Sequence, residues 1–163
     1  MAIMERPRYV PLTDPNDPDD YRPHSEIALA VDPSRPDGRF VKNLAFLFEH
    51  VARGDRIPLH RHTIDEGIVI DEGTAEVRVG SEARLVGPGA VVFIPADTPH
   101  GSRNVGAGPL SLHGVFASDV IPIEYLERNP APGTEGQPPR PPLAYDLREL
   151  LEGDPSKAIR PVR

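Results

Sequence analysis

Two short segments of the chain bring together residue types that bind metal ions. The first contains His60, His62 and Glu66, and the second contains His100. Imidazole nitrogens and carboxylate oxygens are ligands that divalent Fe, Mn, Ni, Cu and Zn accept in proteins. His60 and His62 are two residues apart, so on a strand both point to one face, and Glu66 can return to that face after a turn. The spacing predicts that these four side chains surround one divalent metal ion, whose identity they do not decide.

The spacing within both segments resembles the two motifs of the cupin family. Residues 54–73 fit G-x5-H-x-H-x3-E-x6-G at every defined position, and residues 89–104 fit G-x5-P-x-G-x2-H-x3-N except that Asp97 stands where Gly is usual. The fifteen residues 74–88 between the motifs are similar to the compact spacing of small bacterial cupins. The resemblance covers residues 40–117 and implies a metal-binding barrel. It leaves the reaction open, because the family contains dioxygenases, isomerases, decarboxylases, binding proteins and storage proteins.

Length and composition restrict the class of protein. A chain of 163 residues is long enough for one domain with its own core. A net charge of −7 argues against a nucleic-acid or anionic-membrane partner. The absence of cysteine excludes disulfides and thiolate metal sites. No apolar stretch is long enough for a signal peptide or a membrane span, so a cytoplasmic protein is expected.

The prolines mark the expected domain organisation. Of the 21 prolines, seven lie in residues 1–36 and eight in residues 130–161. Proline cannot donate to a sheet ladder, so the two flanks are expected to be extended arms, turns and short helices. We therefore expect a proline-rich N-terminal arm over residues 1–39, a barrel over residues 40–117 and a C-terminal extension with a short helix over residues 118–163.

The middle of the chain has the pattern of short strands and tight turns. Strands are predicted over residues 43–51, 67–70, 74–79, 83–86, 90–94 and 110–116. Short strands at this regular spacing are typical of an all-β sandwich or barrel. The family resemblance narrows this prediction to a double-stranded β-helix, the cupin form of the jelly roll.

The C-terminal extension has a different, helical pattern. Leucines at 143, 147, 150 and 151, followed by Gly153 and Pro155, predict a short amphipathic helix, and residues 121–128 could form another. These helices could simply pack on the outside of the barrel. Alternatively, Tyr125 or the segment 130–142 closes the cavity mouth or reaches a neighbouring subunit.

Apolar residues are expected to surround the metal ion. Ile68 and Ile70 share the parity of Glu66, and Val91 and Phe93 lie on the strand that enters the second motif. An apolar cavity with a few polar groups is the usual form of a small-molecule site. The sequence therefore predicts a small organic ligand beside the metal.

Few polar residues are candidates for catalysis in this cavity. His50 shares a strand face with two phenylalanines that could point inward, and His113 is ambiguous, so either histidine is an acid–base candidate or a structural residue. His24 is expected in solvent. Asn104 is expected to hold a turn or support a ligand, and Arg61 to point away from the metal.

Two functions are consistent with these residues. Three neutral imidazoles and one carboxylate give a divalent site a net charge of about +1, and an ion with six ligands keeps about two open positions. The first is a metal-dependent enzyme that acts on a small molecule, with an oxygenase favoured over an isomerase or decarboxylase. The alternative is a metal-containing cupin that binds a small ligand without chemistry. We also expect a homodimer, because strands such as residues 67–70 are apolar on both faces.

Overall fold

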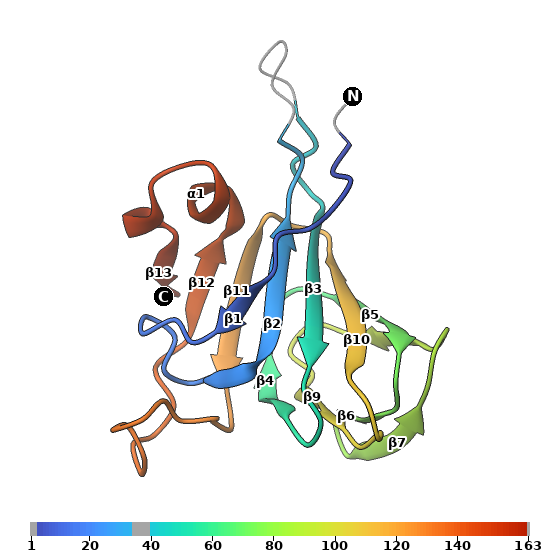
Figure 1. Ribbon diagram of the computed structural model, residues 1–163. Helices are drawn as coiled ribbons and strands as arrows, with labels where there is room; N and C mark the ends of the chain where they lie inside the picture. The colour runs from blue at the N-terminus through green and yellow to red at the C-terminus, as the bar shows by residue number, and fades with distance from the viewer. Residues whose placement is uncertain (1–2, 34–39, 163) are drawn as a thin grey trace.

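The computed structural model describes residues 3–33 and 40–162, which form two antiparallel sheets (Figure 1). The first sheet has the strand order β1 (Val10–Leu12), β2 (Arg22–Ala30), β3 (Ala45–Val51), β10 (Leu110–Phe116), β5 (Glu66–Glu72) and β8 (Val91–Ile94). The second has the order β13 (Ile159–Pro161), β12 (Leu143–Asp146), β11 (Val120–Tyr125), β4 (Arg56–Arg61), β9 (His100–Asn104), β6 (Ala75–Val79) and β7 (Glu82–Val86). The predicted all-β barrel is confirmed. Within the described residues, no helix has the length and hydropathy needed to cross a membrane.

The core lies between the two sheets and follows from the alternation in the strands. Along β10, buried residues alternate with half-buried ones at every position. A cluster of buried side chains joins both sheets and comprises Val51, Ile68, Ile70, Ala75, Val77, Ile94, Leu110 and Leu112. All six strands predicted in the middle of the chain are present, with bounds that differ by no more than two residues. The strand period therefore predicted this part of the fold.

The segment 121–128 is where a helix prediction was wrong. Most of it is the strand β11, whose residues 120–123 pair with β12. Ile121 and Tyr125 are buried, and Glu124 points outward to Arg61. Alternating β-branched and aromatic residues suit a half-buried strand, and β12 supplies the partner that the isolated segment lacks. Helix formation was overridden by this pairing.

The predicted C-terminal helix is present but shorter than expected. Residues 143–146 belong to β12, and α1 spans Leu147–Leu151, followed by a 3-10 turn over Pro155–Lys157. The Asp146 side chain accepts a hydrogen bond from the Glu149 backbone N–H at 3.1 Å and so caps the helix. Leu147 is the buried residue of this helix, which packs against the barrel.

Both flanks add strands to the barrel. In the N-terminal flank, β2 pairs with β3, and in the C-terminal flank, β11 pairs with β4. The predicted boundary between the N-terminal arm and the barrel, at residues 39 and 40, adjoins residues 34–39, which lie outside the described residues. Fully buried Asp19 accepts hydrogen bonds from Arg128 and Arg140, which ties the two flanks together.

Candidate metal centre

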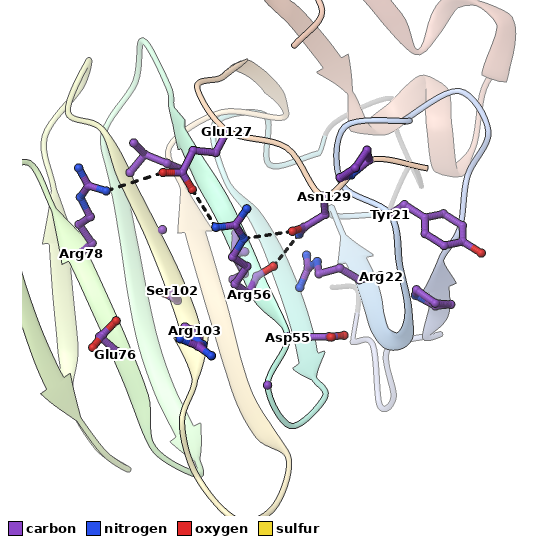
Figure 2. Close-up of a pocket in the computed structure, with 16 residues that line it drawn as sticks. Tyr21, Arg22, Asp55, Arg56, Glu76, Arg78, Ser102, Arg103, Glu127 and Asn129 are labelled. Carbon is purple, nitrogen blue, oxygen red and sulfur yellow. Dashed lines mark hydrogen bonds and ion pairs between the residues drawn. The ribbon is translucent and has the colours of Figure 1, made fainter. Parts of the chain in front are cut away.

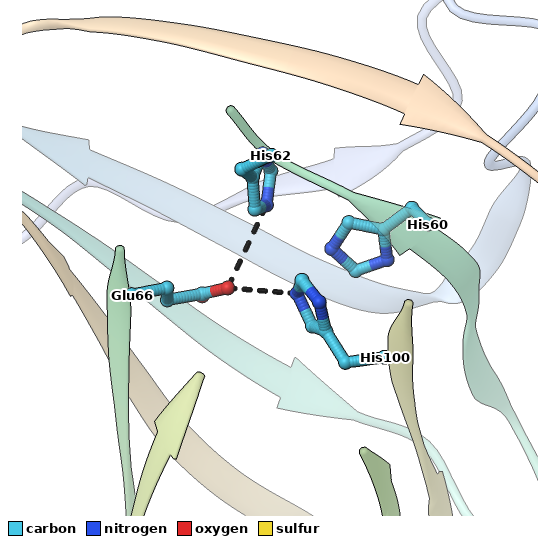
Figure 3. A group of neighbouring side chains, drawn as sticks. All are labelled: His60, His62, Glu66 and His100. Carbon is cyan, nitrogen blue, oxygen red and sulfur yellow. Dashed lines mark ion pairs between the residues drawn. The ribbon is translucent and has the colours of Figure 1, made fainter. Parts of the chain in front are cut away.

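The four residues singled out by their spacing lie together in the interior of the barrel. His60 is on β4, His62 follows that strand, Glu66 begins β5 and His100 begins β9. One ligand atom from each lies within 4.8 Å of those of the other three, and all four residues are buried (Figure 3). His60 and His100 are direct partners across the β4–β9 pair. The fold therefore brings two distant sequence segments to one point.

The histidine rings are held with one nitrogen toward the cluster. Their Nδ1 atoms lie 2.8 Å from the Pro58 carbonyl for His60, 2.5 Å from the Pro122 carbonyl for His62 and 2.8 Å from the Thr98 carbonyl for His100. A carbonyl can only accept, so each Nδ1 carries the proton and each Nε2 presents a lone pair. Backbone carbonyls in this role orient histidine ligands in metalloproteins.

The innermost atoms of the cluster lack the partners that buried polar groups normally have. His100 Nε2 lies 2.8 Å from Glu66 Oε2, and His62 Nε2 lies 3.6 Å from the same oxygen. Within the described residues, neither His100 Nε2 nor Glu66 Oε2 makes a hydrogen bond. Buried polar atoms without partners are rare, and lone pairs that converge in this way suit a cation. The donor set fits one divalent metal ion.

Burial favours the neutral form of the His60 and His62 imidazoles. It lowers the pKa of His60 well below 6.5, and the neighbouring His100 and His62 lower it further. Burial also lowers the pKa of His62, although Glu66 opposes the shift. Neutral imidazole is the form that binds metal, so protons compete weakly with a metal ion at neutral pH.

Two backbone positions next to the candidate ligands have special requirements. A Cβ atom on Gly114 would lie 2.9 Å from Glu66 Oε1, so the missing side chain gives the carboxylate its place. Asp97, which stands where the motif has Gly, has a φ of 62° in the left-handed region. Its backbone N–H donates to the His62 carbonyl at 2.6 Å. The departure from the motif therefore changes the residue in this turn and leaves the turn in place.

The cluster lines a cavity of about 680 Å³. Most of its wall is apolar, with Leu29, Ile68, Leu112, Phe116, Ile121 and Leu147 among the lining residues. Its exposed end is bordered by residues from the N-terminal arm and α1, including Arg6, Arg8 and Leu151. An apolar cavity with a polar cluster inside can hold a small organic molecule.

Some of the residues expected around the metal point elsewhere. Ile68 lines the cavity as predicted, whereas Ile70 was expected beside the metal and instead lies in the core, outside the cavity lining. The placement of Val91 and Phe93 was wrong, because their side chains are 53% and 80% exposed. They pair with Val69 and Gly67 on the outer face of the first sheet. A continuous apolar strand does not reveal which of its faces is inside.

Neither candidate acid–base histidine lines the cavity. The inward residues of β3 include Ala45, Glu49 and Val51, so His50 points outward and stacks on Tyr9. The interpretation that His50 faces the barrel interior was wrong. His113 also lies on the outer face, where its Nδ1 is 2.8 Å from Asp71 Oδ2. Catalytic roles for His50 and His113 are therefore not supported by their positions.

Arg61, His24 and Asn104 lie where the sequence predicted them. Arg61 points outward and pairs with Glu124 at 2.6 Å, and His24 is exposed. The Asn104 side chain holds a turn, because it donates to the Val51 and Gly108 carbonyls. Tyr125 lines the cavity, whereas the segment 130–142 contributes no lining residue.

The sequence reading missed a buried charged group in the cavity region. Asp20, Arg22 and Glu49 are each no more than 7% exposed, and Asp20 and Glu49 line the cavity. Alternation along β3 could have identified Glu49 if the inner face had been assigned correctly. Asp20 and Arg22 lie in the flank that was expected to be an arm.

A second hollow, of about 690 Å³, lies on the outer side of the second sheet (Figure 2). Its charged lining includes Arg56 and Arg78, which share Glu127 at 3.1 and 3.8 Å. None of the four candidate ligands lines this hollow. The candidate metal centre therefore lies in the interior cavity and not in this outer hollow.

Comparisons with known proteins agree with this architecture. Residues 47–116 match the family model described as Cupin domain. A comparison with curated protein sequences finds no match. Among solved structures, an RmlC-like cupin from Shewanella frigidimarina NCIMB 400 is 15% identical with a TM-score of 0.52, and the alignment covers 72% of this chain and 88% of that one.

Two further structures have similar barrels. An uncharacterized protein with a double-stranded β-helix domain from Klebsiella pneumoniae subsp. pneumoniae MGH 78578 is 17% identical with a TM-score of 0.53, covering 62% of this chain and 78% of that one. A mutant oxalate decarboxylase from Bacillus subtilis is 24% identical with a TM-score of 0.54, covering 63% of this chain but only 28% of the decarboxylase. At these identities the similarity concerns the fold alone.

Proposed function

We propose that the chain is a metal-dependent enzyme of the oxygenase type that acts on a small organic molecule. The match of residues 47–116 to the Cupin domain model supports this proposal. The observation that carries this proposal is the position of the candidate ligands. Four ligand atoms converge within 4.8 Å inside a cavity of about 680 Å³. A structural metal site is normally closed by protein ligands, whereas a catalytic one keeps positions open to a cavity.

Different residues of the cavity would have different roles in such an enzyme. His60, His62, Glu66 and His100 would hold the metal. When bound, the metal would supply Lewis-acid activation and a place where dioxygen and substrate meet. The backbone carbonyls of Pro58, Pro122 and Thr98 fix the histidine rings. The apolar wall would exclude water and orient the organic part of the substrate.

The test of this proposal begins with the metal. Protein purified without chelator is analysed for metal content, and metal-free protein is then loaded with Fe(II), Mn(II), Ni(II), Cu(II) or Zn(II). Each form is screened for dioxygen consumption with small molecules that carry two adjacent oxygen donors, with anaerobic reactions as controls. Product analysis under both conditions separates an oxygenase from an isomerase or decarboxylase, which would act without dioxygen.

A matched pair of variants links any activity to the cluster. His100→Ala removes a buried candidate ligand, whereas His24→Ala removes an exposed histidine far from it in the sequence. We expect activity to be lost only in His100→Ala. Turnover that needs no metal, or that survives in His100→Ala, would contradict the proposal. Metal binding without turnover of any compound would favour the alternative of a ligand-binding cupin.

We also propose that the chain forms a homodimer through the outer face of the first sheet. Two neighbouring rows of cross-strand partners run over this face, Phe46–Val115–Gly67–Phe93 and Phe48–His113–Val69–Val91. Phe93 and Val91 are largely exposed at the end of these rows. A contiguous apolar face of this kind is typical of a protein interface, and a second copy of the chain would cover it.

A further inference from the structure

Glu49 is a charged residue at a position where the surrounding inner face is apolar. It is 5% exposed and lines the same cavity as the metal cluster. Its inward neighbours along β3 are Leu47 and Val51, and its partners on the adjacent strands are Ile27 and Leu112. An ionised carboxylate in such a wall is costly unless a partner compensates it.

Arg22 is the nearest charged partner of Glu49, but Asp20 already neutralises it. Arg22 is 2% exposed, and its Nε and Nη2 atoms each donate to one oxygen of Asp20 at 2.7 Å. Asp20 also accepts a hydrogen bond from the side chain of Asn129. This two-pronged pair engages one edge of the guanidinium, so with both carboxyl groups ionised Asp20, Arg22 and Glu49 together carry a net charge of −1.

The contact between Arg22 and Glu49 is incomplete. Arg22 Nη1 lies 2.8 Å from Glu49 Oε2, yet within the described residues neither atom makes an aligned hydrogen bond. Glu49 also lines the cavity, which leaves it accessible to a bound molecule. A purely structural ion pair would need only Asp20, and a surplus buried carboxylate without a function would lower the stability of the fold.

The charged group also lies within electrostatic reach of the metal cluster. Burial raises the pKa of Glu49, Arg22 opposes this shift, and the Glu66 carboxylate is among the groups that raise it. In the same way, Arg22 contributes to the lowered pKa of His60. Because Glu49 and the four candidate ligands line the same cavity, one small molecule can contact both the metal centre and Glu49.

We propose that Glu49 is a substrate-binding residue that accepts a hydrogen bond from a hydroxyl or ammonium group at one end of the substrate. The other end supplies oxygen donors to the metal centre, so this inference rests on the proposed function. The substrate is then a molecule with an apolar middle, a chelating end and a hydrogen-bond donor at the opposite end. Arg22, fixed by Asp20, is a positioning residue that keeps the Glu49 carboxylate in place.

Hydroxamic acids provide a direct probe, because they chelate metals through two oxygens and can carry any terminal group. A series of linear alkyl hydroxamic acids of increasing length is prepared with a methyl, hydroxyl or amino terminus. Dissociation constants are measured by calorimetry with the zinc-loaded full-length protein. We expect one chain length at which the hydroxyl or amino compound binds about tenfold more tightly than its methyl counterpart, as one hydrogen bond to a charged acceptor predicts.

Variants then assign this preference to Glu49. Glu49→Gln keeps the size of the side chain but removes its charge, so the preference for the amino terminus should disappear. Glu72→Gln, which alters an exposed glutamate at the end of β5, should keep the preference. If Glu49→Gln does not fold, Glu49→Asp takes its place: it keeps the charge but shortens the side chain by one methylene, so the preferred chain length of the amino compounds should increase, and an unchanged optimum would refute the role of Glu49.

The outcomes separate this inference from the proposed function. If all hydroxamates bind equally at every length, or if Glu49→Gln keeps the preference, the role of Glu49 is refuted and the metal cavity stands. If no hydroxamate binds the zinc-loaded protein, the substrate cavity beside the metal is refuted, and the role of Glu49 is refuted with it.

Discussion

Gly114→Ala should weaken metal binding without disturbing the fold. The new Cβ would lie 2.9 Å from Glu66 Oε1. Ordinary van der Waals contact begins at about 3.4 Å, so the carboxylate must move by about 0.5 Å. Metal–ligand distances tolerate only about 0.2 Å, and disturbed support of a ligand typically costs 10–100-fold in metal affinity. We expect the affinity to fall by at least about tenfold, or about 1.4 kcal/mol.

The assay is a competition titration of the metal-free protein with zinc and a chromophoric chelator, accompanied by circular dichroism. Gly67→Ala is the matched control, because its new Cβ on the neighbouring strand β5 meets nothing within 4 Å. The control should keep the original affinity. Equal affinities for Gly114→Ala and the unsubstituted protein would refute the argument that the space beside Gly114 positions Glu66 for a metal.

Three further predictions concern stability and assembly. Asn104→Ala removes hydrogen bonds to Val51, Gly106 and Gly108, so urea unfolding should show a loss of about 2–3 kcal/mol while metal stoichiometry stays unchanged. In the metal-free protein, burial lowers the pKa of both His60 and His62, so the unfolded chain takes up protons first as the pH falls. The unfolding free energy should therefore be highest above about pH 6.5. Below this pH it should fall by up to about 1.4 kcal/mol per pH unit for each histidine. An unfolding free energy that stays constant from pH 7 to 5 would contradict this prediction. Light scattering should give twice 17.8 kDa for the unsubstituted chain and 17.8 kDa for Phe93→Glu; a monomeric unsubstituted chain would refute the dimer.

The metal cluster was predictable because its spacing reflects local geometry. His60 and His62 are two positions apart, with Arg61 between them, and the strand period places both on one face. The return of Glu66 needed only the short connection between β4 and β5. The contribution of His100 depended on the family resemblance, because the residue pairs with His60 across two strands that are distant in the sequence.

The inner face of β3 was harder to predict, because both of its faces carry apolar residues. Phe46 and Phe48 are the larger side chains and suggested a core, yet they lie on the outer face with His50. The inner face contains the smaller Leu47 and the charged Glu49. A single sequence does not distinguish a core from an apolar outer face, so the polar residue of the cavity was missed.

Tertiary pairing decided the structure of the flanks. Residues 120–125 form a strand because β12 and β4 lie on either side of it. Proline did not prevent β2 either, since Pro23 lies near the start of the strand, before the residues that pair with β3. The strands that pair with β11 and with β2 cannot be identified from the local sequence pattern of residues 120–125 or of the N-terminal flank.

The most direct test of the central claim is the metal content of the unsubstituted protein and of His62→Ala, measured by elemental analysis after the same loading and desalting. The account predicts close to one divalent metal per chain for the unsubstituted protein and a severe loss for His62→Ala. The far-ultraviolet circular dichroism should be unchanged, because the barrel has a core of its own. An unsubstituted protein that takes up none of the five divalent metals, or a His62→Ala variant that retains a full complement, would contradict the account.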